Sequence, residues 1–321
     1  MLPVAPRWIG VRVSRPAPKF RGRAGAHLIR MQSADIAAWT RVRSPHRLPS
    51  TAMPGDPISD PRVLVAGANL RDLGGLTTIE GRRVRTGLLF RSGYLCDLTG
   101  PDRDVVDSLG LRTILDLRRP TEAAARPHPA IAGVEVVQLS VSSDDNEFAV
   151  LANAMLDPDA EPLGPDHIAD YFRGNVTDRL DRYRPVFHAA TDPGRHPLLF
   201  NCTAGKDRTG FVAGVLLRML GVDERTVLDD YMLSNVVRRG WIAEREVEHR
   251  QRIAESLGIG PDEVPETRLV ASRALLNCER SFLRAALDAV HDCWGSWEAF
   301  RWDGLGISDD RFAAYRDALL A

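Results

Sequence analysis

One short stretch of the 321-residue chain restricts the fold more than any other. An apolar run at residues 198–200 leads through a polar loop at 202–208 into residues 208–220, which are apolar nearly all round. The first run has the length of a buried strand, and the second segment has the pattern of a helix buried on every side. A buried strand joined to a buried helix by so short a loop is typical of layered α/β proteins with a largely parallel sheet.

The same alternation continues along the chain from about residue 61. Short apolar runs that end in glycine or polar residues predict strands at 63–66, 87–90, 112–117, 134–141 and 197–200. Thr99 and Asp102 have the spacing of a capping box and predict a helix start, and helical spacing with breaks covers 166–191. From about residue 222 the pattern indicates helices only. We therefore predict one domain over 61–321, with a central, mostly parallel sheet flanked by helices and a helical C-terminal third.

Residues 1–60 have a different character. Ten Lys or Arg residues face a single acid, Asp35, in residues 1–53, whereas the remainder of the chain has 32 basic and 42 acidic residues. The segment is rich in Arg and Pro and shows no period, so it predicts a disordered basic extension. Met53 as an alternative start and a basic targeting arm are the other interpretations. The acidic balance of the remainder argues against a nucleic-acid partner.

Cysteine usage and hydropathy indicate the compartment. The four cysteines lie far apart, with no CxxC pair and no zinc spacing; they are Cys96, Cys202, Cys278 and Cys293. This spacing argues against a disulfide framework and a metal site, and for a reducing compartment. No apolar run approaches the roughly 20 residues of a membrane span, and no signal peptide is recognisable. We expect a cytoplasmic protein without a transmembrane segment; export without a signal peptide and the oligomeric state stay open.

The 202–208 loop carries the residue types of an anion site. Amide N–H groups ahead of a helix N-terminus converge on one point, and the helix dipole adds positive charge there. Gly205 permits the tight turn. The same field favours the thiolate of Cys202, and the planar fork of Arg208 suits two phosphate oxygens better than a lysine would. We expect attack by Cys202 on a phosphate ester, a phosphocysteine intermediate and hydrolysis by water, with no cofactor. The alternative is a structural cysteine beside a salt-bridged arginine.

The string CTAGKDRTG at 202–210 resembles the signature of the cysteine-dependent protein-tyrosine phosphatase superfamily, in particular of the bacterial tyrosine/serine protein phosphatase family. Further similar segments are NLRDLGG at 69–75, FRS at 90–92, DLR at 116–118 followed by Glu122, YMLSN at 231–235 and WGS at 294–296. The resemblance extends from about residue 63 to the C-terminus. It implies a phosphatase-like fold and a phosphorylated substrate: mainly protein phosphotyrosine, with phosphoserine, phosphothreonine or phosphoinositides as further substrates.

The resemblance also suggests roles for single residues. Asp207 is the candidate general acid, and Asp116 is the runner-up, which otherwise orders Arg118 or the loop. Lys206 adds a point charge or is simply solvated, and Thr209 donates a hydrogen bond to the leaving sulfur. The substrate-binding candidates are Thr203, Ala204, Gly205, Lys206 and Thr209. The supporting residues are Asn201, Asp116, Arg71 and Asp72.

Two features leave alternatives open. Asn201 stands where the family has a histidine that helps to order the loop, so a catalytically weak phosphate-binding relative remains an alternative. A sulfur-transfer or arsenate-reducing enzyme is a further one, because such enzymes also place a cysteine in an anion cradle. Residues 236–276 are dense in charge. By resemblance they form a helical lid over the site, and by composition they form a solvated helical face.

Overall fold

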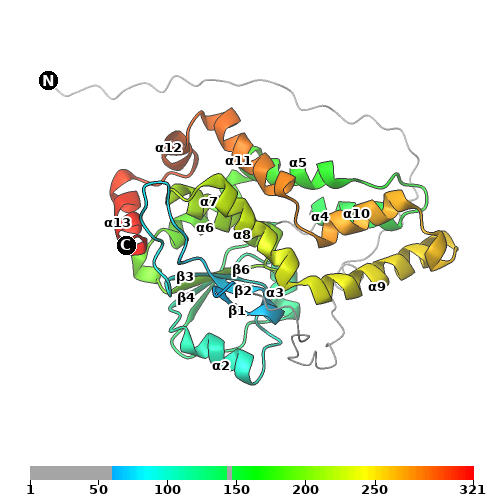
Figure 1. The fold of residues 1–321 in the computed structure, drawn as a ribbon, viewed down its shortest axis with the longest axis horizontal. Helices are drawn as coiled ribbons and strands as arrows, with labels where there is room; N and C mark the ends of the chain where they lie inside the picture. The colour runs from blue at the N-terminus through cyan, green and yellow to red at the C-terminus, as the bar shows by residue number, and fades with distance from the viewer. Residues whose placement is uncertain (1–59, 143–146) are drawn as a thin grey trace.

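The computed structural model describes residues 60–142 and 147–321. Its centre is a six-stranded sheet in the order β1-β2-β3-β6-β4-β5 (Figure 1). Four neighbouring strands run parallel: β3 (Leu89–Ser92), β6 (Leu198–Asn201), β4 (Thr113–Asp116) and β5 (Glu135–Gln138). An antiparallel pair extends the sheet beyond β3: β2 (Leu70–Asp72) and β1 (Val63–Val65). The predicted mostly parallel sheet is confirmed, and so are its five predicted strands; β2 was not predicted. The basic extension at 1–60 falls almost entirely outside the described residues.

The central strands are apolar throughout because both faces of the sheet are buried. Leu198 and Phe200 pack into one core, and Leu199, which points the other way, packs into a second core. The first core lies under α5 (Pro165–Thr177), α6 (Leu180–Ala190), α7 (Asp207–Met219), α8 (Glu224–Val237) and α11 (Arg280–Trp294). The second lies against α2 (Pro101–Ser108), on the opposite side of the sheet (Figure 1).

The helices of the structure lie where the sequence pattern predicted them, except that one helix begins at a different residue. α7 is buried on nearly every side, and the broken helical pattern at 166–191 is the pair α5 and α6. The predicted capping box at Thr99 is wrong. In α2 (Pro101–Ser108) Gly100 is the N-cap, no side chain caps the helix, and Pro101 is its first residue. The remaining helices are α3 (Pro120–Ala125), α4 (Glu147–Leu156), α9 (Arg239–Leu257), α10 (Glu266–Leu276), α12 (Trp297–Ala299) and α13 (Asp309–Leu319). Of the described helices, none combines the length and apolar character needed to cross a membrane.

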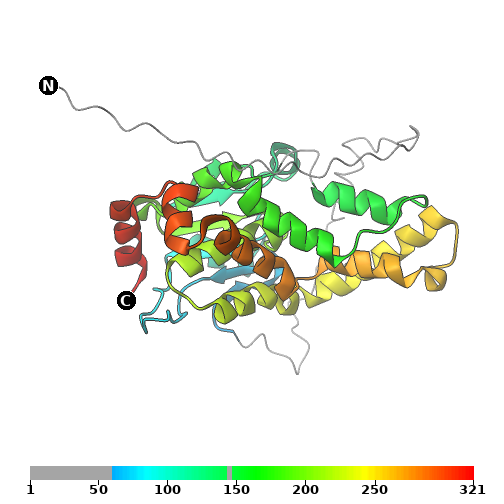
Figure 2. The ribbon, with the colours of Figure 1, turned by 90° about the horizontal axis from the view of Figure 1, so that it is seen from above.

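Helices α4, α9 and α10 project beyond the sheet in both ribbon views (Figures 1 and 2). They share a small core of their own, formed by Met155, Ile253, Ala254, Val264, Leu269 and Ala271. Arg268 on α10 is buried and donates hydrogen bonds to the carbonyl oxygens of Met155 (2.8 Å) and Ala160 (3.0 Å), at and just beyond the end of α4. A hollow of about 370 Å³ between α9 and α10 contains no residue of the 202–208 loop. The lid at 236–276 remains a prediction.

Candidate active site

The 202–208 loop begins where three parallel strands end. Ser92 on β3, Asn201 on β6 and Asp116 on β4 are direct neighbours across the sheet, and the chain leaves β6 at Cys202. The carboxyl edge of a parallel sheet is the common place for ligands in open α/β folds. α7 begins at Asp207, so the loop joins this edge directly to a helix N-terminus.

The backbone of the loop is held with its carbonyl groups outward. The Thr203 carbonyl accepts a hydrogen bond from the amide of Tyr94 (3.1 Å). The Ala204 and Gly205 carbonyls accept hydrogen bonds from Asn69 Nδ2 (3.2 and 3.0 Å). In a trans peptide the N–H points away from the C=O. The amides that follow these three carbonyls therefore point to the opposite side of the loop.

Those amides are the donors that an anion could use. The N–H groups of residues 203–206 have no acceptor among the described residues. The amides of the first turn of α7 have no partner within the helix, as in every α-helix. Arg91 adds a second hydrogen bond that holds the Gly205 carbonyl outward (2.9 Å). Successive unpaired amides at a helix N-terminus form a concavity suited to an oxyanion.

Gly205 is required by this backbone for two reasons. Its φ is +65°, in the left-handed region that favours glycine. A Cβ at this position would also lie only 2.5 Å from the backbone nitrogen of Gly93. The loop thus packs directly on the end of β3, and any larger residue at 205 would displace it.

Arg208 is anchored by Glu122, which comes from α3. Nη1 of Arg208 donates to Glu122 Oε2 (2.8 Å), and Nη2 donates to Oε1 (3.1 Å). Thr203 Oγ1 donates to Glu122 Oε1 (2.7 Å). Burial would raise the pKa of Glu122, but the charge of Arg208 and that of Arg119 hold it well below its usual value. The carboxylate therefore stays ionised and fixes the plane of the guanidinium. Sequence reasoning noted Glu122 only as part of the DLR segment and gave it no role.

Cys202 lies inside this arrangement, and its residue is 2 % exposed. Burial opposes the charged form of Arg208, but the charges of Glu122 and Cys202 outweigh burial and raise the pKa of Arg208. Cys202 therefore lies close enough to the guanidinium for their charges to interact. Thr209, in the first turn of α7, has a buried hydroxyl without a hydrogen-bond partner in the described part of the chain. That hydroxyl is free to donate to a group in the loop.

Asp207 and Lys206 form an ion pair at the start of α7. Lys206 Nζ lies 3.1 Å from Asp207 Oδ1 and donates to the carbonyl oxygen of Asn277 (2.8 Å). Lys206 is 2 % exposed, so the solvated interpretation of this lysine is wrong: its ammonium ties the loop to the end of α10. The hydroxyl of Tyr231 donates to Asp207 Oδ1 (3.4 Å). Asp207 is partly exposed, whereas Lys206 is buried.

Asn201 and Asp116 support the loop from the sheet. Asn201 Nδ2 donates to the Cys202 carbonyl (3.3 Å), and His128 Nε2 lies 3.1 Å from Asn201 Oδ1. Arg118 donates to both oxygens of Asp116 (2.8 and 2.7 Å). Burial would raise the pKa of Asp116, but hydrogen bonds from His128 and Arg118 lower it. A carboxylate so well paired holds no proton near neutral pH, which favours an ordering role over that of a general acid.

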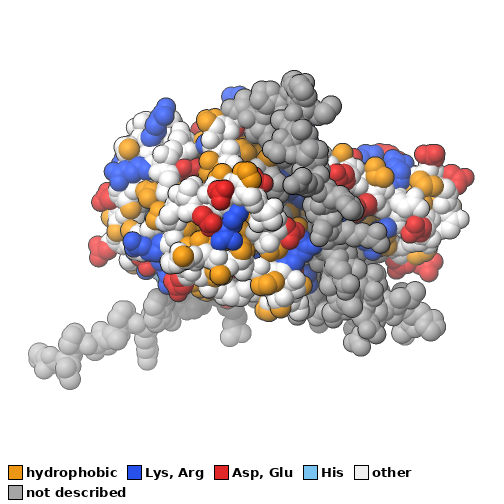
Figure 3. Space-filling model, turned by 90° about the horizontal axis from the view of Figure 1, so that it is seen from below, with side chains coloured by type: hydrophobic (Ala, Val, Ile, Leu, Met, Phe, Trp, Pro, Cys, Tyr) orange, Lys and Arg blue, Asp and Glu red, His pale blue; other side chains and the backbone are white. Residues whose placement is uncertain are grey.

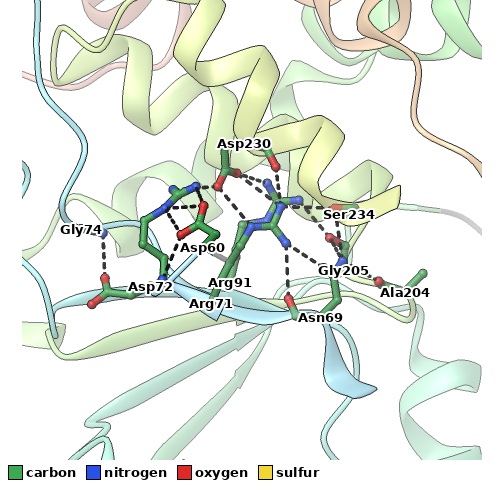
Figure 4. Close-up of polar contacts among 11 residues, drawn as sticks. Asp60, Asn69, Arg71, Asp72, Gly74, Arg91, Ala204, Gly205, Asp230 and Ser234 are labelled. Carbon is green, nitrogen blue, oxygen red and sulfur yellow. Dashed lines mark hydrogen bonds and ion pairs between the residues drawn. The ribbon is translucent and has the colours of Figure 1, made fainter. Parts of the chain in front are cut away.

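A buried ionic cluster lies beside the loop (Figure 4). Asp230 on α8 pairs with Arg71 (3.1 Å), Arg91 (2.7 Å) and Arg62 (3.0 Å). Burial would raise the pKa of Asp230, but the three guanidinium charges lower it. Because Arg91 also donates to the Gly205 carbonyl, the cluster helps to hold the loop in place. Arg71 also donates to Oδ1 of Asn69 (2.7 Å), whose amide nitrogen holds the loop carbonyls.

Asp72 lies apart from this assembly. Its carboxylate accepts hydrogen bonds from the amides of Gly74 (2.7 Å) and Gly87 (2.6 Å). Figure 4 shows its side chain pointing away from the loop. Of the supporting residues named from the sequence, Asp72 thus stabilises a neighbouring turn and makes no hydrogen bond to the 202–208 loop among the described residues.

Known proteins resemble this chain over most of its length. A family model described as "Tyrosine phosphatase family" matches residues 63–321. A Cupriavidus necator protein named as a tyrosine-protein phosphatase is 33 % identical over 75 % of this chain and 82 % of its own. The triple specificity protein phosphatase PtpB of Mycobacterium tuberculosis is 27 % identical over 81 % of this chain and 99 % of its own.

Among solved structures, the core catalytic domain of the S. cerevisiae PP-IP phosphatase SIW14 is similar, at 17 % identity. The match covers 55 % of this chain and 83 % of the SIW14 chain, and its TM-score is 0.26, a structural similarity too low to carry an argument. The family match extends over far more than half of the chain and includes the strand, loop and helix that carry Cys202 and Arg208. The chain belongs to the tyrosine phosphatase family.

Proposed function

We propose that this chain hydrolyses phosphate monoesters with Cys202 as the nucleophile. The arrangement of the 202–208 loop carries the proposal: its carbonyls are bound outward, its amides are unpaired, and Arg208 is fixed by Glu122 beside the buried thiol. Donors that point at one position before the substrate arrives stabilise the charge that develops in the transition state without having to reorganise. A phosphoryl group bound there would lie directly over Cys202.

The reaction proceeds in two displacements. In the first, Cys202 Sγ forms a bond to phosphorus while the bond to the leaving oxygen breaks, and Asp207, as the general acid, supplies the proton that this oxygen takes up. In the second, water attacks the phosphocysteine, Asp207 takes the proton of that water, and the sulfur leaves as a thiolate. Arg208 binds two oxygens of the transferred group throughout. The unpaired hydroxyl of Thr209 supports its part as donor to the departing sulfur.

Phosphotyrosine in proteins is the proposed main substrate, with phosphoserine, phosphothreonine and phosphoinositides as further candidates. The names of the relatives support this range, since one is a tyrosine-protein phosphatase and another a triple specificity protein phosphatase. Turnover of p-nitrophenyl phosphate, a phosphotyrosine peptide, the matching phosphoserine peptide and a short-chain phosphoinositide tests the proposal. We expect the highest kcat/KM for the phosphotyrosine peptide. The absence of turnover on all four would instead support a phosphate-binding protein without catalysis.

A further inference from the structure

Arg238 directly follows α8 and is only 8 % exposed. Its guanidinium carbon lies 4.0 Å from the centre of the Trp241 ring. Asp230, Ser234 and Arg238 are spaced by four residues and therefore share one face of the helix. Asn69 Nδ2 donates to Ser234 Oγ (3.3 Å) and also holds the 202–208 loop, so this face runs along the loop. Arg238 occupies the end of that row.

The side chain of Arg238 is mostly buried, its guanidinium nitrogens are not among the fully enclosed polar atoms, and it has no ion pair among the described residues. Among the described residues its guanidinium makes no hydrogen bond and no ion pair, and it lies over the ring of Trp241, which Arg245 also approaches at 5.4 Å. The other buried arginines all donate to carboxylates or backbone carbonyls; they are Arg71, Arg91, Arg118, Arg119, Arg268 and Arg301. A guanidinium that has no anionic partner keeps its five N–H donors available to an anion that reaches it.

The groups that face Arg238 place it beside the loop. Burial is the largest effect and lowers the pKa of Arg238, while four neighbouring acidic groups, in their ionised forms, oppose the change. In order of influence these neighbours are Cys278, Asp207, Cys202 and Tyr94. Two of them belong to the loop and its helix start, and one lies at the junction of α10 and α11. The guanidinium therefore lies within electrostatic reach of the thiol that the mechanism uses, without pairing with any of these groups.

We propose that Arg238 binds a second anionic group of the substrate, the carboxylate of an acidic residue that flanks the phosphotyrosine, and so selects acidic phosphopeptides. The inference rests on the proposed function and adds a specificity residue to it. The two oxygens of a carboxylate match the planar fork of arginine. The Trp241 ring holds one face of the guanidinium and leaves its N–H edges for the ligand.

The charge of the domain favours a peptide over a membrane lipid as the source of this anion. Residues 54–321 contain 42 acidic and 32 basic side chains. On the face drawn in Figure 3, Lys and Arg side chains are interspersed with Asp and Glu and do not form a single basic patch. Anionic membranes are bound by clusters of basic residues, each of which adds attraction. Arg245, which also lies over the Trp241 ring, is paired with Glu248, so Arg238 is left to bind one carboxylate.

The test compares two phosphotyrosine peptides that differ only in Asp or Asn at the positions flanking the phosphotyrosine. In the unmodified protein we expect kcat/KM to be about ten-fold or more higher for the acidic peptide, mainly through KM. In Arg238→Gln this ratio is expected to fall to about one. Arg239→Gln is the matched control: Arg239 is the next residue and exposed, so the ratio should stay as it was. The ratio of the two kcat/KM values is measured on one preparation, so it does not depend on the fraction of the protein that is folded.

Arg238→Lys provides a second variant, because lysine keeps the charge but loses the fork; an intermediate ratio is expected. A ratio that persists in Arg238→Gln, or a ratio of one in the unmodified protein, would overturn the assignment. So would a loss confined to a soluble short-chain phosphoinositide, which would move the anion from peptide to lipid headgroup. Failure of the proposed function itself has a different signature, namely no turnover of p-nitrophenyl phosphate by the unmodified protein.

Discussion

Cys202→Ser is expected to lower kcat on p-nitrophenyl phosphate by a factor on the order of 10⁶, the loss that follows removal of the nucleophile from a covalent hydrolase. A serine hydroxyl has nearly the size of the thiol, so the loop should keep its hydrogen bonds to Asn69 and Arg91. The hydroxyl stays protonated at neutral pH and is a weak nucleophile without an adjacent base. We therefore expect phosphate binding to persist while turnover disappears.

The measurement is steady-state turnover together with calorimetric titration of inorganic phosphate. Cys293→Ser is the matched control, since this cysteine is exposed and lies outside the site, and it should retain full activity. Turnover in Cys202→Ser within ten-fold of the unmodified protein would assign the nucleophile to another group. Loss of phosphate binding along with turnover would show that the thiol shapes the cradle and does not act only as the attacking atom.

Asp230→Asn is expected to be the most destabilising polar substitution in the described domain. The change leaves Arg71 and Arg91, each 0 % exposed, without their carboxylate. Removing one partner of a buried ionic network costs about 3–5 kcal/mol of unfolding free energy, because the remaining charges stay buried. The control is Asp229→Asn, one residue away, where an exposed pair with Arg280 is lost. Exposed pairs contribute about 0–1 kcal/mol.

The pH dependence of stability provides a second readout of the same substitution. The pKa of Asp230 in the fold lies below its ordinary value of 3.8, so its stabilising effect is complete above that value. The effect is lost as the pH falls below 3.8 through the lower folded value. Urea unfolding between pH 7 and pH 3 should show a smaller acid loss in Asp230→Asn than in the control. Equal unfolding free energies for the two variants at pH 7 would contradict the role given to the cluster.

The elements with a strong local pattern were predictable from sequence. The strand before Cys202 and the helix after it are apolar on all sides, and burial on both faces of the sheet explains why. β2 was missed because it has only three residues and two of them are charged: Arg71 is buried by its ionic partner and not by apolar character. The start of α2 was misplaced because proline begins that helix without a side-chain cap.

The site was predictable only where its residues are neighbours in sequence. Cys202, Asp207 and Arg208 lie within one loop, and their spacing predicted that they lie together at a helix N-terminus. Glu122 reaches Arg208 across 86 positions, and no local pattern pairs an acid on one helix with an arginine on another. The burial of Lys206 also depends on a distant backbone carbonyl, that of Asn277. Such long-range pairs depend on the topology of the fold, which brings the ends of separate strands and helices to the carboxyl edge of the sheet.

The central claim is that a phosphoryl group is transferred to Cys202, and rapid acid quenching tests it directly. Asp207→Asn is the suitable variant with p-nitrophenyl phosphate: nitrophenolate leaves without needing a proton, whereas hydrolysis of the intermediate loses its base. Mass spectrometry of the peptide containing Cys202 should then show the mass of one added phosphoryl group, at close to one per active site. A peptide that stays unmodified while a burst of nitrophenolate is released, or a phosphoryl group on a different residue, would contradict the mechanism.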